Sequence, residues 1–153
     1  MTQDELLDII HVCHEKYPSK VWEHASRVAS IVQMDTTYAF LSEEQQRFVK
    51  ALAYAHDLLE DTQVELSVFA DIIHDEYELS DFQMDLVLLT HVGHDSYYDY
   101  VSQIVESKRA FPILVKKADM KDHLSLKETL TERLKRKYYP VLPMLMGPHY
   151  VWR

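Results

Sequence analysis

Residues 48–61 read Phe-Val-Lys-Ala-Leu-Ala-Tyr-Ala-His-Asp-Leu-Leu-Glu-Asp. Apolar side chains at positions 48, 52, 55 and 59 recur at the three- and four-residue steps of a buried helix. Helical spacing then sets Glu60 over His56 and Asp61 over Asp57, so four polar groups share roughly one quadrant. Because buried charge is costly without a partner or a metal, this quadrant indicates a functional cluster. The other interpretation is a helix end that turns into solvent, with Asp61 capping the next segment.

The same apolar spacing recurs along the chain, with Ser or Thr followed three residues later by Glu or Gln, the pattern of a capping box. The matches are Thr2 and Glu5, Ser42 and Gln45, Thr62 and Glu65, Ser80 and Gln83, and Ser125 and Glu128. We expect helices over residues 3–16, 20–35, 42–59, 64–77, 80–91, 97–107, 110–123 and 126–138. The sequence therefore predicts an all-α, single-domain bundle of about seven to eight helices.

Length and composition agree with this plan. A chain of 153 residues is the size of one domain. It contains only two glycines, Gly93 and Gly147, which excludes Gly-rich phosphate loops and disfavours a turn-rich β-sandwich or barrel. We expect the bundle to occupy residues 1–139. The apolar, Pro-containing tail, residues 140–153, is expected to pack on the domain or on a partner, so the sequence fits both a monomer and a homo-oligomer.

The formal net charge of −9 disfavours nucleic-acid and anionic-membrane partners. Residues 108–137 nevertheless hold ten Lys or Arg and four Asp or Glu, a local balance of +6. Such a segment is either a solvated helix face or an attractor for a small anionic ligand. No apolar run reaches the length of a membrane span, no signal peptide is evident, and the single Cys13 cannot form an internal disulfide. We expect a cytoplasmic protein without a membrane partner.

Two further polar residues interrupt apolar series. His24 lies between Val21 and Val28, and Asp119 follows the run Ile-Leu-Val-Lys-Lys-Ala. Each alone is more often structural than functional. Together with His56 and Asp57 they give two imidazoles and two carboxylates from three expected helices, a mixed N/O donor set that suits a divalent transition metal.

The order His24, His56-Asp57 and Asp119 resembles the HD phosphohydrolase superfamily. Within it, His-Asp-Leu-Leu-Glu-Asp-Thr at residues 56–62 and Lys-Lys-Ala-Asp at 116–119 are similar to segments of the RelA/SpoT-type (p)ppGpp hydrolase domain and its small stand-alone relatives. The similarity extends over roughly residues 5–125.

The resemblance implies an HD-type helical fold and a (p)ppGpp 3′-pyrophosphohydrolase. It implies one Mn²⁺ bound by His24, His56, Asp57 and Asp119, although this ligand set also tolerates Fe²⁺, Zn²⁺ or Mg²⁺. In that family the Glu-Asp pair assists the attacking water, which assigns a catalytic role to Glu60 and Asp61. The implied substrate is a small anionic nucleotide.

Substrate contacts are expected from the residues around this set. Lysines near Asp119 offer positive charge to a phosphoryl group, and the turn after Thr90 leads to tyrosines that approach the substrate in small relatives. The candidates are Lys116, Lys121, His123, Thr90 and Tyr98.

Two departures from the family affect specificity. His123 stands where the family carries a substrate-binding Asn, and residues 14–20 match the guanine-stacking segment poorly. Two other functions therefore stay open: another HD-type nucleotide or phosphate-ester hydrolase, and a non-catalytic module that binds a metal and a nucleotide.

Overall fold

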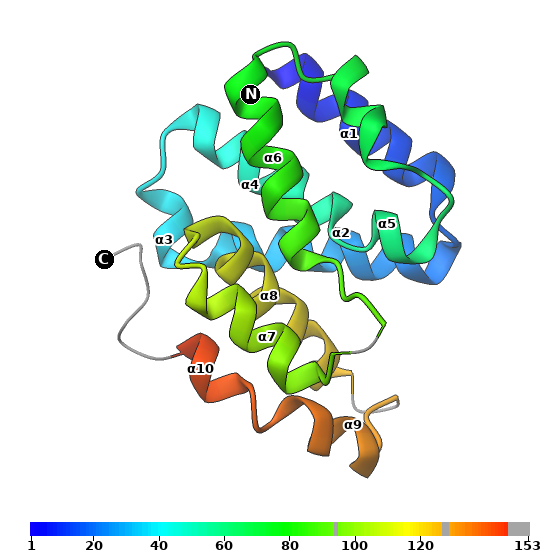
Figure 1. Cartoon of the computed structure of the whole chain (residues 1–153), viewed down its shortest axis with the longest axis vertical. Helices are drawn as coiled ribbons and strands as arrows, with labels where there is room; N and C mark the ends of the chain where they lie inside the picture. Colours follow the sequence, from blue (N-terminus) through cyan, green and yellow to red (C-terminus); the bar gives the residue numbers. More distant parts are fainter. Residues whose placement is uncertain (94, 127–128, 147–153) are drawn as a thin grey trace.

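The computed structural model describes residues 1–93, 95–126 and 129–146, and within them every regular element is helical (Figure 1). The elements are α1 (Gln3–Lys16), α2 (Ser19–Met34), α3 (Thr36–Ala39), α4 (Glu43–Ala55), α5 (Leu58–Asp61), the 3₁₀ helix η1 (Leu66–Asp71), α6 (Glu76–Leu89), α7 (Tyr97–Glu106), α8 (Ala110–Ser125), α9 (Glu132–Tyr138) and α10 (Leu142–Met146). The all-α prediction is confirmed, although the described residues form ten α-helices instead of seven to eight, because several of them are short.

Several helix ends lie where the sequence predicts them. Thr2 and Ser42 form complete capping boxes at the starts of α1 and α4, and the Ser96 hydroxyl accepts a hydrogen bond from the Asp99 N–H at the start of α7. Helix α1 ends before Pro18, with Tyr17 in an extended conformation, as expected for the residue before a proline. Local hydrogen bonding thus fixes these ends.

Other boundaries were predicted wrongly. The expected helices over 64–77 and 80–91 are replaced by η1 and by α6, which runs through the expected break, because Asp75 caps α6 and Ser80 lies inside it. Thr62 begins no helix; it is the C-terminal cap of α5, and its hydroxyl donates to Leu58 O. The short α3 was not predicted. The helix expected over 126–138 begins at Glu132, capped by Thr131, and Glu128 lies outside the described residues.

Helix α2 is the centre of the packing: it contacts α4 on one side and α8 on the other, and α1 packs on α4. Figure 1 shows α2 running across the middle of the molecule, with α1 toward one end of the molecule and α9 and α10 toward the other. The core is filled by fully buried apolar side chains such as Val28, Leu52, Phe82 and Met120. This arrangement brings α2, the end of α4 and α8 together, although they are distant in the sequence.

The first part of the C-terminal tail packs on the bundle. Val141 and Leu145 are buried, and α10 contacts α7 and α8. Residues 147–153 of the predicted tail lie outside the described residues. Among the described helices, none combines the length and the apolar character needed to cross a membrane.

Candidate metal centre

The helix that carries the His-Asp motif ends earlier than the sequence predicts. Helix α4 stops at Ala55, and Asp57 has φ −100° and ψ 2°, outside the helical region. Two side chains satisfy carbonyl groups of the last turn: the Tyr17 hydroxyl donates to Tyr54 O over 2.6 Å, and His56 Nδ1 lies 2.7 Å from Ala53 O. Because neighbouring side chains on a continuous helix diverge by about 100°, this break is what lets His56 and Asp57 face the same cluster.

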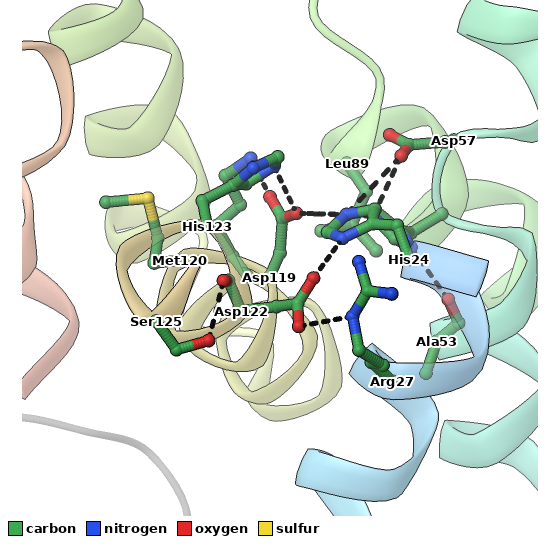
Figure 2. A network of polar contacts seen from close by, with 12 residues as sticks. His24, Arg27, Ala53, Asp57, Leu89, Asp119, Met120, Asp122, His123 and Ser125 are labelled. Atoms are coloured by element: carbon green, nitrogen blue, oxygen red, sulfur yellow. Dashed lines mark hydrogen bonds and ion pairs between the residues drawn. The ribbon is translucent and has the colours of Figure 1, made fainter. Parts of the chain in front are cut away.

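Three helices contribute to that cluster, which Figure 2 shows from close by. His24 comes from the middle of α2, His56 and Asp57 from the α4–α5 junction, and Asp119 from α8. The Asp57 Oδ2 atom lies 3.2 Å from His56 Nε2 and 3.7 Å from His24 Nε2. The Asp119 Oδ1 atom lies 2.8 Å from His24 Nε2 and 3.5 Å from His56 Nε2. The structure therefore brings together all four residues that the resemblance assigns to a metal.

The outer nitrogens of the two imidazoles are held by acceptors. His24 Nδ1 lies 2.6 Å from Asp122 Oδ2, and the other oxygen of Asp122 accepts a hydrogen bond of 2.8 Å from Arg27 Nε. The Ala53 carbonyl is likewise an acceptor for His56 Nδ1. Since a carboxylate and a carbonyl only accept, each Nδ1 carries the proton in the neutral imidazole and the Nε2 lone pair points to the cluster. This second shell is the usual arrangement around metal-bound histidines.

The His56 Nε2 atom tests whether the site fits a cation. It is fully buried and has no hydrogen-bond partner among the described residues. Buried polar atoms without a hydrogen-bond partner are rare in proteins and mark a site for an ion or a water molecule, strain or a functional role. Here the atom faces two carboxylates and a second imidazole, which together form the donor set of a divalent ion.

The electrostatics of the cluster agree with this fit. Burial lowers the pKa of His24 and His56, but the neighbouring carboxylates outweigh it, Asp119 for His24 and the negative charge of Asp57 and Asp119 for His56, so both pKa values lie above the usual range. Burial raises the pKa of Asp119, but the Lys116 ammonium, 2.7 Å away, and the surrounding imidazoles hold it well below its usual range. Burial likewise raises the pKa of Asp57, but the charge of His56 outweighs it and the pKa lies below its usual range, so both aspartates are ionised.

A small cavity of about 110 Å³ adjoins the cluster. Glu60 lines it, and its carboxylate accepts a hydrogen bond from the His91 N–H. Burial raises the pKa of Glu60, and this hydrogen bond offsets the shift only in part. Asp61 is raised in pKa by burial and by the charge of Asp57, but it lines a different cavity beside Lys16 and Thr62. The two acidic residues of the motif thus lie in different surroundings.

The same cavity is lined by two lysines and three tyrosines. Burial lowers the pKa of Lys116, but the charge of Asp119 outweighs it and the pKa lies well above its usual range. The Lys137 ammonium lies 4.6 Å from the centre of the Tyr97 ring, and its pKa is lowered by burial and by the charge of Lys116. The cavity therefore presents two cations beside a buried carboxylate cluster; its lining residues are Asp57, Glu60, Leu89, His91, Tyr97, Tyr100, Lys116, Asp119, His123, Lys137 and Tyr138.

Three of the expected substrate-binding residues lie elsewhere. Lys121 is exposed on α8, Tyr98 is 53% exposed on α7, and Thr90 ends α6 with its hydroxyl donating to Leu86 O. None of them lines the cavity, whereas Lys116 and His123 do.

The sequence analysis missed several neighbours of the site. Asp122 follows Asp119 by three residues and so lies on the same face of α8, a spacing that would have found it. Of the tyrosines expected to approach the substrate after Thr90, Tyr97 and Tyr100 share a face of α7 and line the cavity, whereas the chosen candidate Tyr98 does not. Lys137 and Tyr138 carry no comparable signal, because α9 reaches the site only through the tertiary fold.

No protein-family model matches the chain, and a comparison with curated proteins likewise gives no match.

Proposed function

We propose that the protein is a metal-dependent phosphohydrolase that acts on a nucleotide, with 3′-pyrophosphate removal from (p)ppGpp as the reaction tested first. The observation that carries this proposal is the buried, unpartnered Nε2 atom of His56 among donors from three helices. A structural polar cluster would pair every buried donor and acceptor. A set that leaves a lone pair facing two carboxylates is suited to a cation.

The residues proposed to hold one divalent ion are His24, His56, Asp57 and Asp119. Mn²⁺ follows from the resemblance, and Fe²⁺, Zn²⁺ and Mg²⁺ suit the same donor types. When bound, such an ion lowers the pKa of water and neutralises charge on phosphoryl oxygens. Four protein ligands leave room in an octahedral shell for oxygen ligands from solvent and substrate.

Glu60 is the proposed general base. Its carboxylate lines the cavity and is held by the His91 N–H, and its raised pKa brings it closer to the range in which a carboxylate accepts a proton efficiently. In the proposed reaction a water oxygen forms a bond to phosphorus while Glu60 takes the proton. The bond between phosphorus and the ribose 3′ oxygen breaks, the 3′ oxygen leaves with the nucleotide and takes up a proton to become a hydroxyl, and pyrophosphate that contains the water oxygen is released. Asp61 is proposed to support this step only through its charge.

Lys116 and Lys137 are the proposed partners of the phosphoryl oxygens. Both line the cavity, and their ammonium groups repel each other. Burial and the charge of Lys116 accordingly lower the pKa of Lys137. A phosphoryl group between them and the cluster relieves this repulsion and places cations where negative charge develops in the reaction. Lys121, which the sequence suggested for this role, is exposed on α8 and does not line the cavity.

The size of the cavity favours a second candidate within the same chemistry. A volume of about 110 Å³ is below the roughly 300 Å³ at which pockets enclose whole ligands, so only a phosphoryl-sized group enters. Such a site selects the phosphate more strongly than the base. Hydrolysis of another nucleotide or phosphate ester is therefore the second candidate.

A substrate panel separates these candidates. Phosphate and pyrophosphate release is measured with added Mn²⁺ from ppGpp and from ordinary nucleoside mono-, di- and triphosphates, with Asp57→Ala as the control. Pyrophosphate from ppGpp that disappears in the variant supports the first candidate. Release from another compound only supports the second, and metal retention without any turnover favours a non-catalytic binding module.

A further inference from the structure

Three imidazoles, not two, converge on one oxygen atom of the cluster. Asp119 Oδ1 lies 2.8 Å from His24 Nε2, 3.1 Å from His123 Nε2 and 3.5 Å from His56 Nε2. We propose that His123 is a fifth protein ligand of the metal ion, and that its imidazole shifts the preference of the site from Mn²⁺ toward metals that favour nitrogen. This inference rests on the proposed metal site and adds a ligand that changes its selectivity, so that one octahedral position stays open for an oxygen ligand instead of two.

The position of His123 follows from the helix that carries it. It lies one turn after Asp119 on α8, so both side chains emerge from the same face. The His24 and His123 rings have centroids 4.5 Å apart. Figure 2 shows the His123 ring beside the Asp119 carboxylate, on the side opposite the Asp57 carboxylate. His123 thus extends the same donor set and does not start a separate one.

The separations between donor atoms fit coordination of a single ion. His24, Asp119 and His123 form one group of neighbouring donor atoms, and His24, His56 and Asp57 form another. The measured separations within these groups range from 2.8 Å, between His24 Nε2 and Asp119 Oδ1, to 3.7 Å, between His24 Nε2 and Asp57 Oδ2. Ligands that each lie about 2.1 Å from one ion are separated by about 3.0 Å when adjacent and about 4.2 Å when opposite. The two overlapping groups share His24, so an ion between them draws on both.

Packing holds the His123 ring in place from the other side. The ring stacks on Tyr138 of α9 with centroids 5.1 Å apart and planes 15° from parallel. The side chain is 36% exposed, so it contacts both solvent and cluster. The stacking restricts rotation of the ring and so keeps its Nε2 atom directed to Asp119. Packing of this kind holds a metal ligand in position.

The chemical consequence is a change in metal preference. Three imidazoles and two carboxylates form a set richer in nitrogen than the four-residue set. Imidazole suits Fe²⁺, Zn²⁺ and Cu²⁺, whereas Mn²⁺ and Mg²⁺ favour oxygen ligands, and affinity for a given site rises from Mn²⁺ through Co²⁺ in the usual order. Removal of one imidazole should therefore weaken Co²⁺ binding more than Mn²⁺ binding.

The test compares metal binding in three full-length proteins: the wild type, His123→Asn and His11→Asn. His11 is the matched control, because its side chain is 77% exposed on α1 and takes no part in the cluster. Each protein is stripped with a chelator and titrated calorimetrically with Mn²⁺ and with Co²⁺, and the visible absorption spectrum of the Co²⁺ form is recorded. Thermal unfolding of the metal-free proteins verifies that the variants fold.

For His123→Asn we expect Co²⁺ affinity to fall by about tenfold or more, Mn²⁺ affinity by less than about threefold, and the Co²⁺ absorption bands to change. His11→Asn should match the wild type. Equal changes for both metals, or an unchanged Co²⁺ spectrum, would overturn the proposal while leaving the four-residue site and its hydrolase activity intact. A wild type that binds neither metal would overturn the proposed function as well.

Discussion

Two buried aspartates in this molecule have opposite electrostatics. Asp85 on α6 and Asp119 on α8 are 3% and 4% exposed. Asp85 is paired with Arg109, and burial raises its pKa to about 6 despite that partner. The pKa of Asp119 lies well below its usual range, because Lys116 and three imidazoles surround it. Burial alone thus favours the neutral acid, and it is the charge of Lys116 together with the hydrogen bonds from the imidazoles that keeps the buried Asp119 carboxylate charged.

The cavities beside the two aspartates differ in the same sense. Asp85 lines a cavity of about 830 Å³ together with Glu78, Asp81, Lys108 and Arg109. Asp119 lines a cavity of only about 110 Å³. The larger cavity has a carboxylate that is already paired, whereas the smaller one adjoins a nitrogen without a partner. The candidate site is therefore identified by a buried nitrogen atom without a hydrogen-bond partner, and not by the volume of the cavity beside it.

The largest effect is expected from loss of a proposed metal ligand, which should abolish activity in the cluster region and not in the Asp85 region. Asp57→Ala removes a proposed ligand, so the bound metal and the activity should disappear together, with a loss on the order of 10³-fold or more in turnover. Elemental analysis of desalted protein and the rate of phosphate release measure the two quantities. Asp85→Asn is the matched control and should keep both, and equal losses in the two variants would end the distinction.

The second effect concerns the general base. Glu60→Gln keeps the shape of the side chain but cannot accept a proton, so turnover should fall by about 10²- to 10⁴-fold while metal content stays unchanged. Asp61→Asn should lose less, because Asp61 lines a different cavity. Full activity of Glu60→Gln on the true substrate would remove the base from the mechanism.

A smaller effect is expected from the second shell of the cluster. Asp122→Asn replaces the carboxylate that holds His24 Nδ1, so metal affinity should weaken by about 10- to 100-fold. Calorimetric titration with Mn²⁺ measures the change. An unchanged affinity would show that Asp122 holds the fold and not the ligand.

The smallest effect is on stability and belongs to the Asp85 region. Because the folded-state pKa of about 6 lies above the ordinary value near 3.8, the folded state binds the proton more tightly, and stability gains as the pH falls through 6. Relative to Asp85→Asn, the wild type should gain about 1 kcal/mol in the free energy of unfolding between about pH 7 and about pH 5. Urea unfolding at the two pH values measures this difference. A wild type that loses stability relative to Asp85→Asn as the pH falls would show that the pKa of Asp85 is not raised by folding.

The same two regions show what the sequence can predict. Helix ends with a side-chain cap, such as Thr2 and Ser42, were predicted correctly, because the capping interaction is local. The helix start predicted from Ser80 and Gln83 was wrong. Residues three apart also share a face inside a helix, and α6 begins earlier, with Asp75 as its cap. Local spacing therefore finds a helix more reliably than it finds the residue at which the helix starts.

In the site, too, features that depend on sequence order were predicted and features that depend on tertiary packing were not. The four proposed ligands were named from motif order, and the structure places them in one cluster. The break after Ala55 was missed, because it depends on the Tyr17 hydroxyl and the His56 ring binding the carbonyls of the last turn. Lys137 reaches the cavity from α9, and a residue brought in by tertiary packing leaves no mark in local spacing.

Reconstitution with metal decides whether the cluster is a catalytic metal site. Protein stripped with a chelator is reloaded with increasing Mn²⁺, and bound metal and phosphate or pyrophosphate release from the nucleotide panel are measured at each step. The account predicts no turnover without metal, and activity that rises with bound metal and levels off at about one ion per chain. Turnover that is independent of metal, or a chain that holds its ion and hydrolyses none of the panel, would contradict it.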